Sequence, residues 1–281
     1  MNNYLEIEIK SVEEIYEFIE IYNKHWKVPC VGGNTETRAF YRGQSNAHWA
    51  IEPSIVRYNE DEREQYIKYK EHLKGKDLFS QFAYLQHYAT GTRLIDFTTN
   101  PDVALYFACV ENLSMDAAFF LYLYNAHRAE WLDTIMFTEI MEMSCTGKLK
   151  IRDFSEMLYQ KYVEIRCKYK DIADLDMTLM GYLDHGYMVL PSNVCKQNNL
   201  RVCCQDGVFY ICGVKFVDVI TAEKRFESRA GNNEFICHSI QTPDSLKNEC
   251  PLVKVVIPKK LKKSILIFLE KKGITKEYLF P

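Results

Sequence analysis

The chain has 281 residues, of which 47% are hydrophobic and 14% aromatic, and its formal net charge is -3. This is enough apolar material for a substantial core, in one large domain or two small ones. A charge so near neutral does not indicate nucleic acid or an acidic membrane as a partner, although a local basic patch would still allow nucleic acid to bind. We find no signal peptide and no membrane span, so we expect a cytoplasmic protein.

The first part of the chain predicts helices around a short strand. Ser11 and Glu14 form a capping box at the start of an amphipathic pattern. Asn100 and Pro101 are typical of a helix start, with asparagine as N-cap and proline in the first turn. We expect a helix over 11–25, a strand over 38–43, helices over 60–90, a loop over 89–100 and a buried helix from 101 onward.

The second part predicts strands separated by a helical insertion, followed by an amphipathic helix. We expect strands over 117–125, 207–214 and 252–258, a helical insertion over about 127–185, and a last helix over 258–273. The buried stripe of that helix is Leu261, Ile265, Phe268 and Leu269, and its lysines, Lys262 among them, are expected on the exposed face. This order does not repeat as βαβ, so the fold class is α+β with a mixed central sheet, in a single domain.

The 10 cysteines need an interpretation. Four of them lie within residues 195–212, but no C-x-x-C pair occurs there. Cys203 and Cys204 are adjacent, so on a strand they would point to opposite faces. Small buried side chains are favoured over a zinc site, and no metal is expected.

Two segments place polar side chains in apolar surroundings. The first is "FYRGQ", which contains Arg42, and the second is "LQHYATGTRLIDFTTNPDVALYFA". Buried polar groups need partners. These side chains therefore either satisfy one another as a structural cluster or line a pocket.

These motifs resemble the FRG domain family, which is named for a Phe-Arg-Gly motif. That motif is stretched here to Phe40-Tyr41-Arg42-Gly43. The second family signature matches Gln86-His87-Tyr88, Thr92-Arg93-Leu94, Asp96-Phe97-Thr98, Asn100-Pro101 and 104–108. A third matches Arg201, Gln205, Gly207 and Phe209, and a closing motif matches 273–281. We therefore expect one FRG domain over 1–281, with its core over about 38–281.

The motif layout of FRG domains is similar to that of ADP-ribosyltransferases. The resemblance implies an ADP-ribosyltransferase-like fold, with the sheet split around helices, and NAD as a substrate. It also implies roles such as bacterial toxin or phage-defence effector. In this interpretation the catalytic set is Arg42, Thr98, Gln205 and Asp96. The NAD-binding set is Arg42, Gly43, Tyr41, His87, Tyr88, Arg93 and Thr99.

The chemistry of NAD suits these residue types. A strand-end arginine binds a pyrophosphate through several donors, and a glycine beside it allows the ligand to approach the backbone. Tyr41, Tyr88 or Phe97 would stack on the nicotinamide ring. Cleavage of the glycosidic bond requires a carboxylate. Gln205 stands where the transferase pattern has glutamate, which leaves Asp96, Asp206 or Glu223 to supply the charge.

Simpler structural explanations stay open for each of these residues. Arg42 would tie a strand end to a loop, Arg93 would pair with Asp96, and His87 would pack in the core. Thr98 and Thr99 would be explained by turn chemistry before the helix start, and His48 and Trp49 by loop structure.

Three functions remain in competition. The first is an NAD-dependent ADP-ribosyltransferase-like enzyme with an unknown macromolecular acceptor, for which Arg42, Thr98 and Gln205 must converge on one cleft. The second is a metal-independent nuclease that uses His87, Arg42 and Arg93. The third is a module that binds a nucleotide-like small molecule or a protein segment without turnover.

Overall fold

The computed structural model describes residues 5–25, 36–76, 78–89, 91–128, 131–144, 146–217, 230–242 and 252–281. The strands are β1 (Leu5–Glu8), β2 (Glu36–Gln44), β3 (Leu94–Thr98), β4 (Ala117–Arg128), β5 (Lys148–Lys150), β6 (Tyr187–Leu190), β7 (Gly207–Ile211), β8 (Glu234–Ile236) and β9 (Leu252–Ile257).

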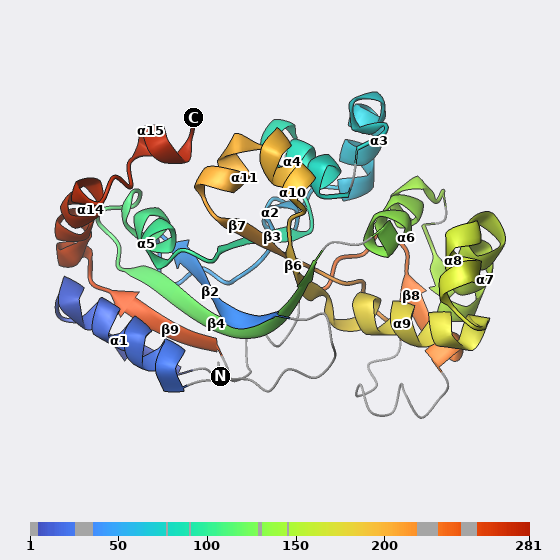
Figure 1. The fold of residues 1–281 in the computed structure, drawn as a ribbon, viewed down its shortest axis with the longest axis horizontal. Helices are drawn as coiled ribbons and strands as arrows, with labels where there is room; N and C mark the ends of the chain where they lie inside the picture. The colour runs from blue at the N-terminus through green and yellow to red at the C-terminus, as the bar shows by residue number, and fades with distance from the viewer. Residues whose placement is uncertain are drawn as a thin grey trace.

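The α-helices complete the α+β fold (Figure 1). They are α1 (Val12–His25), α2 (Ser54–Arg57), α3 (Glu62–Leu73), α4 (Leu78–Tyr88), α5 (Pro101–Cys109), α6 (Trp131–Glu142), α7 (Ile151–Lys161), α8 (Val163–Lys168), α9 (Ile172–His185), α10 (Asn193–Asn198), α11 (Leu200–Cys204), α14 (Lys262–Lys271) and α15 (Lys276–Leu279).

The central sheet is mixed, as the sequence predicts. Its seven strands follow the order β1-β9-β4-β2-β3-β7-β6, and β6 also pairs with the end of β4. The pairings β1–β9 and β4–β6 are parallel, and the others are antiparallel. The pairing of β6 with β4 links β4, β2, β3, β7 and β6 in a ring. One face of these five strands supplies a buried cluster that includes Phe40, Phe97, Phe120, Met188 and Tyr210.

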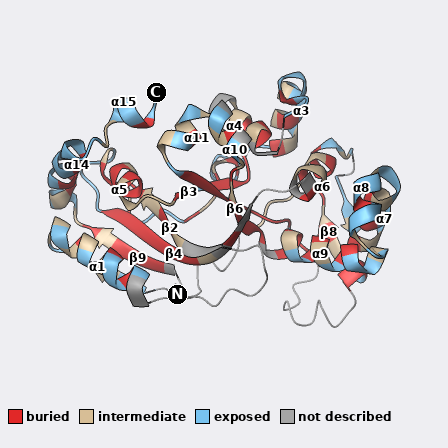
Figure 2. Cartoon of the chain, viewed as in Figure 1, coloured by how far each residue is buried: buried red, intermediate tan, exposed pale blue. Residues whose placement is uncertain are grey.

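Helices cover the rest of the sheet in two groups (Figure 1). Helices α1, α5 and α14 pack on β2, β4 and β9, where Ile15, Leu105 and Ile265 are fully buried. The predicted insertion contains α6 to α9 and also the short strand β5, which pairs with β8. In Figure 2 the central strands are mostly buried, while the outward faces of the helices are exposed.

Residues 89–100 are wrongly predicted as a loop, because 94–98 form β3 inside the sheet. Leu94, Ile95 and Phe97 are buried, and Asp96 is the exposed position between them. β3 is therefore a short central strand whose single charged residue hides its apolar pattern. The predicted start of the next helix is confirmed, since the side chain of Asn100 caps α5.

The last long helix differs from its prediction at two positions. Ile265 and Leu269 are buried as expected, but Phe268 is 39% exposed. Lys262 is 0% exposed, and its Nζ donates to the carbonyl oxygens of Ser45, Glu111 and Asn112 at 2.8–3.0 Å. A lysine was expected to face solvent, but three carbonyl acceptors compensate for its burial. Lys262 thereby connects the segment that follows β2, at Ser45, to the segment that follows α5, at Glu111 and Asn112.

Two adjacent cysteines also differ from the prediction. Cys203 and Cys204 lie at the end of helix α11 and not on a strand. Among the described residues, no group of three or more His, Cys, Asp and Glu side chains could hold a metal ion. No helix in the described part of the chain is long and apolar enough to cross a membrane.

Candidate functional site

The candidate site is a cavity where β2 and β3 separate. Strand β2 pairs with β4 along its whole length, from Glu36 to Gln44. It pairs with β3 at Tyr41 and Thr98 alone. A cavity of about 810 Å³ lies at this point, and its lining includes residues of β2, β3, α5, α11 and the segment 49–60. Because β2 and β3 pair at one position, residues of both strands border this cavity.

Arg42 bridges the two strands from one side of this cavity. Its Nη1 donates to the carbonyl oxygen of Asp96 at 2.5 Å. Its Nε is buried and has no hydrogen-bond partner among the described residues. Burial lowers the pKa of Arg42 to about 10, the charge of Asp96 opposes that shift, and Arg57 adds to it. Arg42 therefore stays protonated at neutral pH, with a desolvated charge and an unused donor that a bound anion would satisfy.

Gly43 is needed for packing. A Cβ at this position would clash with the carbonyl oxygen of Ala104 and would lie 2.5 Å from the amide nitrogen of Ala108. Both atoms belong to α5, so the missing side chain allows this helix to lie directly on β2. Gly43 also contributes to the cavity lining, so its expected role in admitting a ligand to the backbone stays a prediction beside this packing role.

Thr98 and Gln205 also line the cavity, so the two residues and Arg42 converge as the transferase hypothesis requires. Thr98 Oγ1 donates to the carbonyl oxygen of Gln205 at 2.7 Å and accepts from the amide of Asn100 at 3.0 Å. The side chain of Gln205 points to the C-terminal segment, where its Nε2 donates to the carbonyl oxygen of Leu279 at 3.0 Å. The hydroxyl of Thr98 thus joins β3 to the segment after α11.

Asp96 is the predicted carboxylate that lies on the cavity. Its side chain is exposed, and one oxygen accepts from Gln86 Nε2 at 3.3 Å. Asp206 is not among the lining residues and accepts from Asn100 Nδ2 at 3.2 Å. Glu223 lies outside the described residues. Of the three carboxylates that the sequence offers, Asp96 alone has a described position on the cavity.

The other predicted NAD-binding residues differ in whether they line the cavity. Tyr41 lines the cavity, but its ring stacks on Phe119 and its hydroxyl exchanges hydrogen bonds with Asn23. Burial raises the pKa of Tyr41, as expected for a phenol within the core. Thr99 is not among the lining residues, and its amide donates to the carbonyl oxygen of Asp206 at 3.1 Å. The side chains of His87 and Tyr88 lie outside the described part of the structure.

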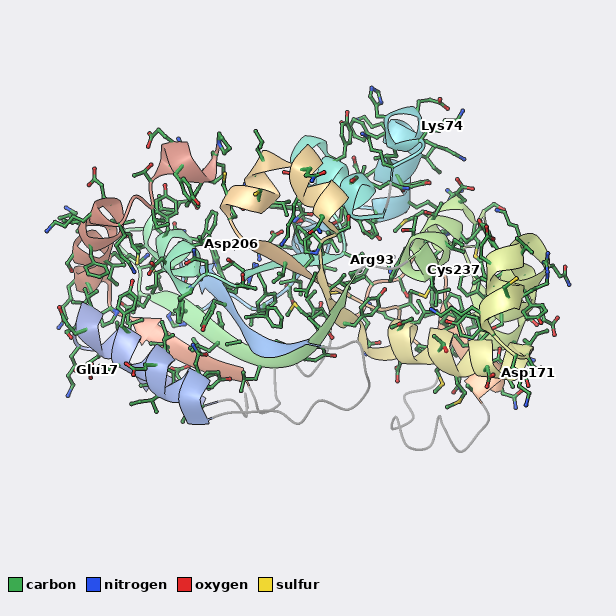
Figure 3. The ribbon with its side chains drawn as sticks, viewed as in Figure 1. Glu17, Lys74, Arg93, Asp171, Asp206 and Cys237 are labelled. Carbon is green, nitrogen blue, oxygen red and sulfur yellow. The ribbon has the colours of Figure 1, made fainter. Side chains whose placement is uncertain are left out.

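The structure corrects the assignment of Arg93 to the NAD-binding set, because this side chain lies in the core and is not among the cavity-lining residues. The side chain is 0% exposed, and its Nε donates to Glu62 at 2.7 Å. Its guanidinium lies over the ring of Phe137, at 5.0 Å from the ring centroid. Arg93 precedes β3, while the cavity lies at the end of β3 that contains Thr98; Figure 3 shows Arg93 well apart from Asp206. The suggested alternative pairing with Asp96 is also wrong, since the partner is Glu62.

Several cavity residues were missed by the sequence reasoning. Arg57 and Arg201 both line the cavity, together with Trp49, which is 42% exposed. The guanidinium of Arg57 lies 5.6 Å from the centroid of the Trp49 ring. Burial lowers the pKa of Arg201, and the charge of Asp96 opposes this shift. Arg201 was matched to the third signature, four residues before Gln205, but it was not assigned to the site.

The comparisons with known proteins identify one part of the chain. A family model described as "FRG domain" matches residues 37–117. The chain contains an FRG domain. The matched part of the FRG domain runs from β2 through α5, so it supplies Arg42, Asp96 and Thr98 but not Gln205. It is shorter than the range over 38–281 that the motifs suggest. No match to this chain was found among curated proteins or among solved structures.

Proposed function

We propose that the cavity binds NAD or a related nucleotide and that the protein is ADP-ribosyltransferase-like. The observation that supports this proposal most is the position of Arg42. Its charged side chain is desolvated, and its buried Nε has no partner among the described residues, on a cavity that two further arginines line. A ligand phosphate would stabilise this side chain, because it supplies a negative counter-charge and hydrogen-bond acceptors. The cavity volume of about 810 Å³ is in the range of small-molecule sites.

The aromatic residues of the lining suit the other parts of a nucleotide. Trp49, Phe107 and Phe209 contribute apolar surface on which a base or nicotinamide ring can pack. In the transfer reaction the bond between ribose C1′ and the nicotinamide nitrogen breaks, and its electron pair leaves with nicotinamide. A nucleophile of the acceptor then bonds to C1′ and loses its proton. Asp96 is the residue that we assign to stabilise the positive charge on the ribose.

Binding without turnover is the second candidate, and a specific observation favours it. Gln205 replaces the glutamate of the transferase pattern, and its amide group donates to Leu279. The nuclease hypothesis loses support, because Arg93 is enclosed in the core with Glu62.

Calorimetry with NAD and with ADP-ribose tests the proposal directly. We expect binding by the wild type and a loss of affinity of about tenfold or more for Arg42→Ala, because charged hydrogen bonds are lost. Arg166→Ala is the matched control, since Arg166 is exposed on α8 and bonds to the carbonyls of Tyr159 and Gln160. Absence of binding to both ligands would overturn the proposal.

Nicotinamide release then separates the two candidates. An enzyme releases nicotinamide during long incubation with NAD, and the rate falls in Asp96→Asn. A binding module retains NAD unchanged in the same sample, with the affinity that calorimetry measures.

A further inference from the structure

Three buried polar atoms of cavity residues have no hydrogen-bond partner in the described part of the chain. They are Arg42 Nε, Gln44 Oε1 and Ser54 Oγ, and all three residues line the cavity. Buried polar atoms of folded proteins are nearly always paired, so unpaired atoms that gather at one cavity indicate partners that a ligand supplies. Arg42 suits a phosphate, which leaves the glutamine and the serine to be explained.

The side-chain amide of Gln44 has a fixed orientation. Its Nε2 donates to the carbonyl oxygen of Ala50 at 3.1 Å. A carbonyl oxygen can only accept, so the NH₂ end of the amide faces Ala50, and Oε1 is the end without a partner among the described residues. Gln44 is 4% exposed and pairs with Ala118 in the β2–β4 ladder. The strand and the bond to Ala50 therefore fix the position of an unpaired acceptor.

Gln44 complements Arg42 in its chemistry. Side chains alternate along a strand, so Gln44 and Arg42 lie on the same face of β2, and two residues of a strand span about 7 Å. The guanidinium donates and attracts an anion, whereas the amide oxygen accepts and repels a phosphate. The hydroxyl of Ser54 can donate or accept, so it selects neither kind of partner. Gln44 is thus the group that calls for an N–H of the ligand.

An aromatic surface lies beside the Gln44 amide. Trp49 directly precedes Ala50, the residue that accepts from Gln44, and its ring is exposed and lines the cavity. The guanidinium of Arg57 lies 5.6 Å from the centroid of this ring, and the neighbouring Ile51 is buried. A planar ring that packs on Trp49 would therefore bring its polar substituents to the part of the cavity that contains Gln44.

We propose that Gln44 is a specificity-determining residue, whose Oε1 accepts a hydrogen bond from a primary amide or amine on a ring of the ligand. This inference rests on the proposed nucleotide-binding function, whose cavity it shares. In NAD two groups have this chemistry, the carboxamide of nicotinamide and the 6-amino group of adenine. A site built to bind an N–H rejects an analogue that lacks it, because the buried acceptor then stays unpaired.

Calorimetry with three dinucleotides tests this selection. They are NAD, nicotinic acid adenine dinucleotide, in which a carboxylate replaces the carboxamide, and nicotinamide hypoxanthine dinucleotide, in which a carbonyl oxygen replaces the 6-amino group. We expect the wild type to bind one analogue about tenfold more weakly than NAD, and that analogue identifies the ring that Gln44 contacts. Gln44→Met removes the acceptor with little change in size, so it should bind NAD and that analogue alike. Equal affinity of the wild type for all three would overturn the inference.

Gln81→Met is the matched control. Gln81 is a buried glutamine in α4 whose Nε2 donates to the carbonyl oxygen of Lys76 at 2.8 Å, and it is not among the cavity-lining residues. This variant should keep the preference of the wild type, and a preference that also persists in Gln44→Met would overturn the role of Gln44. A wild type that binds none of the three dinucleotides would instead refute the proposed function itself.

NMR of the wild type gives a second measurement that needs no variant. An N–H that bonds to Oε1 polarises the amide, so saturating NAD should move the side-chain ¹⁵N signal of Gln44 downfield and leave that of Gln81 in place. The analogue that lacks the contacting N–H should leave both signals in place. A Gln44 signal that does not move at saturation with NAD would overturn the assignment, even if Gln44→Met fails to fold.

Discussion

Arg42 and Arg93 stand in the two signature segments, but the fold surrounds them differently. Arg93 is enclosed by the helical part of the molecule, where Glu62 pairs with its Nε and also accepts from its amide at 2.6 Å. Arg42 lies where β2 and β3 separate, and its one described hydrogen bond goes to a backbone carbonyl, while the lining of the cavity holds two more arginines. The difference lies in the counter-charge and the location, because Nη1 and Nη2 of Arg93, like Nε of Arg42, have no hydrogen-bond partner among the described residues. A buried carboxylate compensates the charge of Arg93 within the core, whereas Arg42 lies on a cavity that a ligand could fill.

The largest expected effect is on the Arg93 side of this comparison. Arg93→Met removes the cation beside Glu62, which is itself buried. We expect the free energy of unfolding to fall by about 3–5 kcal/mol, because an uncompensated carboxylate remains in the core. Urea denaturation followed by circular dichroism measures this change.

The double variant Arg93→Met/Glu62→Leu is the control. It should recover most of the lost stability, since removal of both charges from a buried pair is often close to neutral. If the single variant is as stable as the wild type, the pair does not have the structural role that we assign to it.

A smaller effect is expected at Gly43, on the cavity side. Gly43→Ala places a methyl group against the backbone of Ala104 in α5. We expect a loss of about 1–3 kcal/mol in the free energy of unfolding, because the helix must move away from β2. Gly181→Ala in α9 is the matched control, since a Cβ there meets no atom within 4 Å. The control should be neutral or stabilising, and equal losses for the two would refute the packing role.

Much of the fold could be predicted from local sequence signals. The capping box at Ser11, the Asn100–Pro101 pair and the long apolar run of β4 each act through neighbouring residues, so pattern reasoning was sufficient. β3 was missed because five residues with one central charge carry little periodicity. Lys262 was misplaced because its three carbonyl acceptors belong to distant segments of the chain.

At the candidate site, too, contacts between distant segments of the chain could not be predicted from the sequence. The signatures bring Arg42, Thr98 and Gln205 to one cavity, but their order alone does not say which polar groups are already satisfied. The hydroxyl of Thr98 bonds to the backbone of Gln205, and Arg93 pairs with a glutamate 31 residues away. Such pairings depend on tertiary distances, which a motif does not contain.

Arg42 itself should contribute little to stability. Arg42→Met removes one hydrogen bond to the Asp96 carbonyl but also relieves the cost of a desolvated charge. We therefore expect the free energy of unfolding to change by about 1 kcal/mol or less, in contrast to Arg93→Met. Urea denaturation of both variants in one buffer makes the comparison. A loss as large as that of Arg93→Met would place Arg42 among the structural arginines.

The smallest effect is a pH dependence on the Arg93 side. His238 lies with its Nε2 at 3.0 Å from the carbonyl oxygen of Met143. Burial is the largest cause of a lowered pKa at His238, and the positive charges of Arg63 and, to a smaller extent, Arg93 lower the pKa further. The hydrogen bond to the Met143 carbonyl and the negative charge of Asp61 oppose this shift. A histidine with a lowered pKa takes up its proton more readily in the unfolded chain. Its contribution to stability is therefore complete above its ordinary pKa of about 6.5 and is lost as the pH falls below that value.

We expect the free energy of unfolding to decrease between pH 7 and pH 5, with a shallower slope in His238→Asn. Asparagine suits this position, because the backbone φ of His238 is 59° and asparagine tolerates the left-handed region. Denaturation at a series of pH values gives both slopes. Equal slopes would mean that folding does not lower the pKa of His238. A shallower slope in the variant would show that the folded protein disfavours the charged form of His238, chiefly through burial, with Arg63 and Arg93 as smaller contributors.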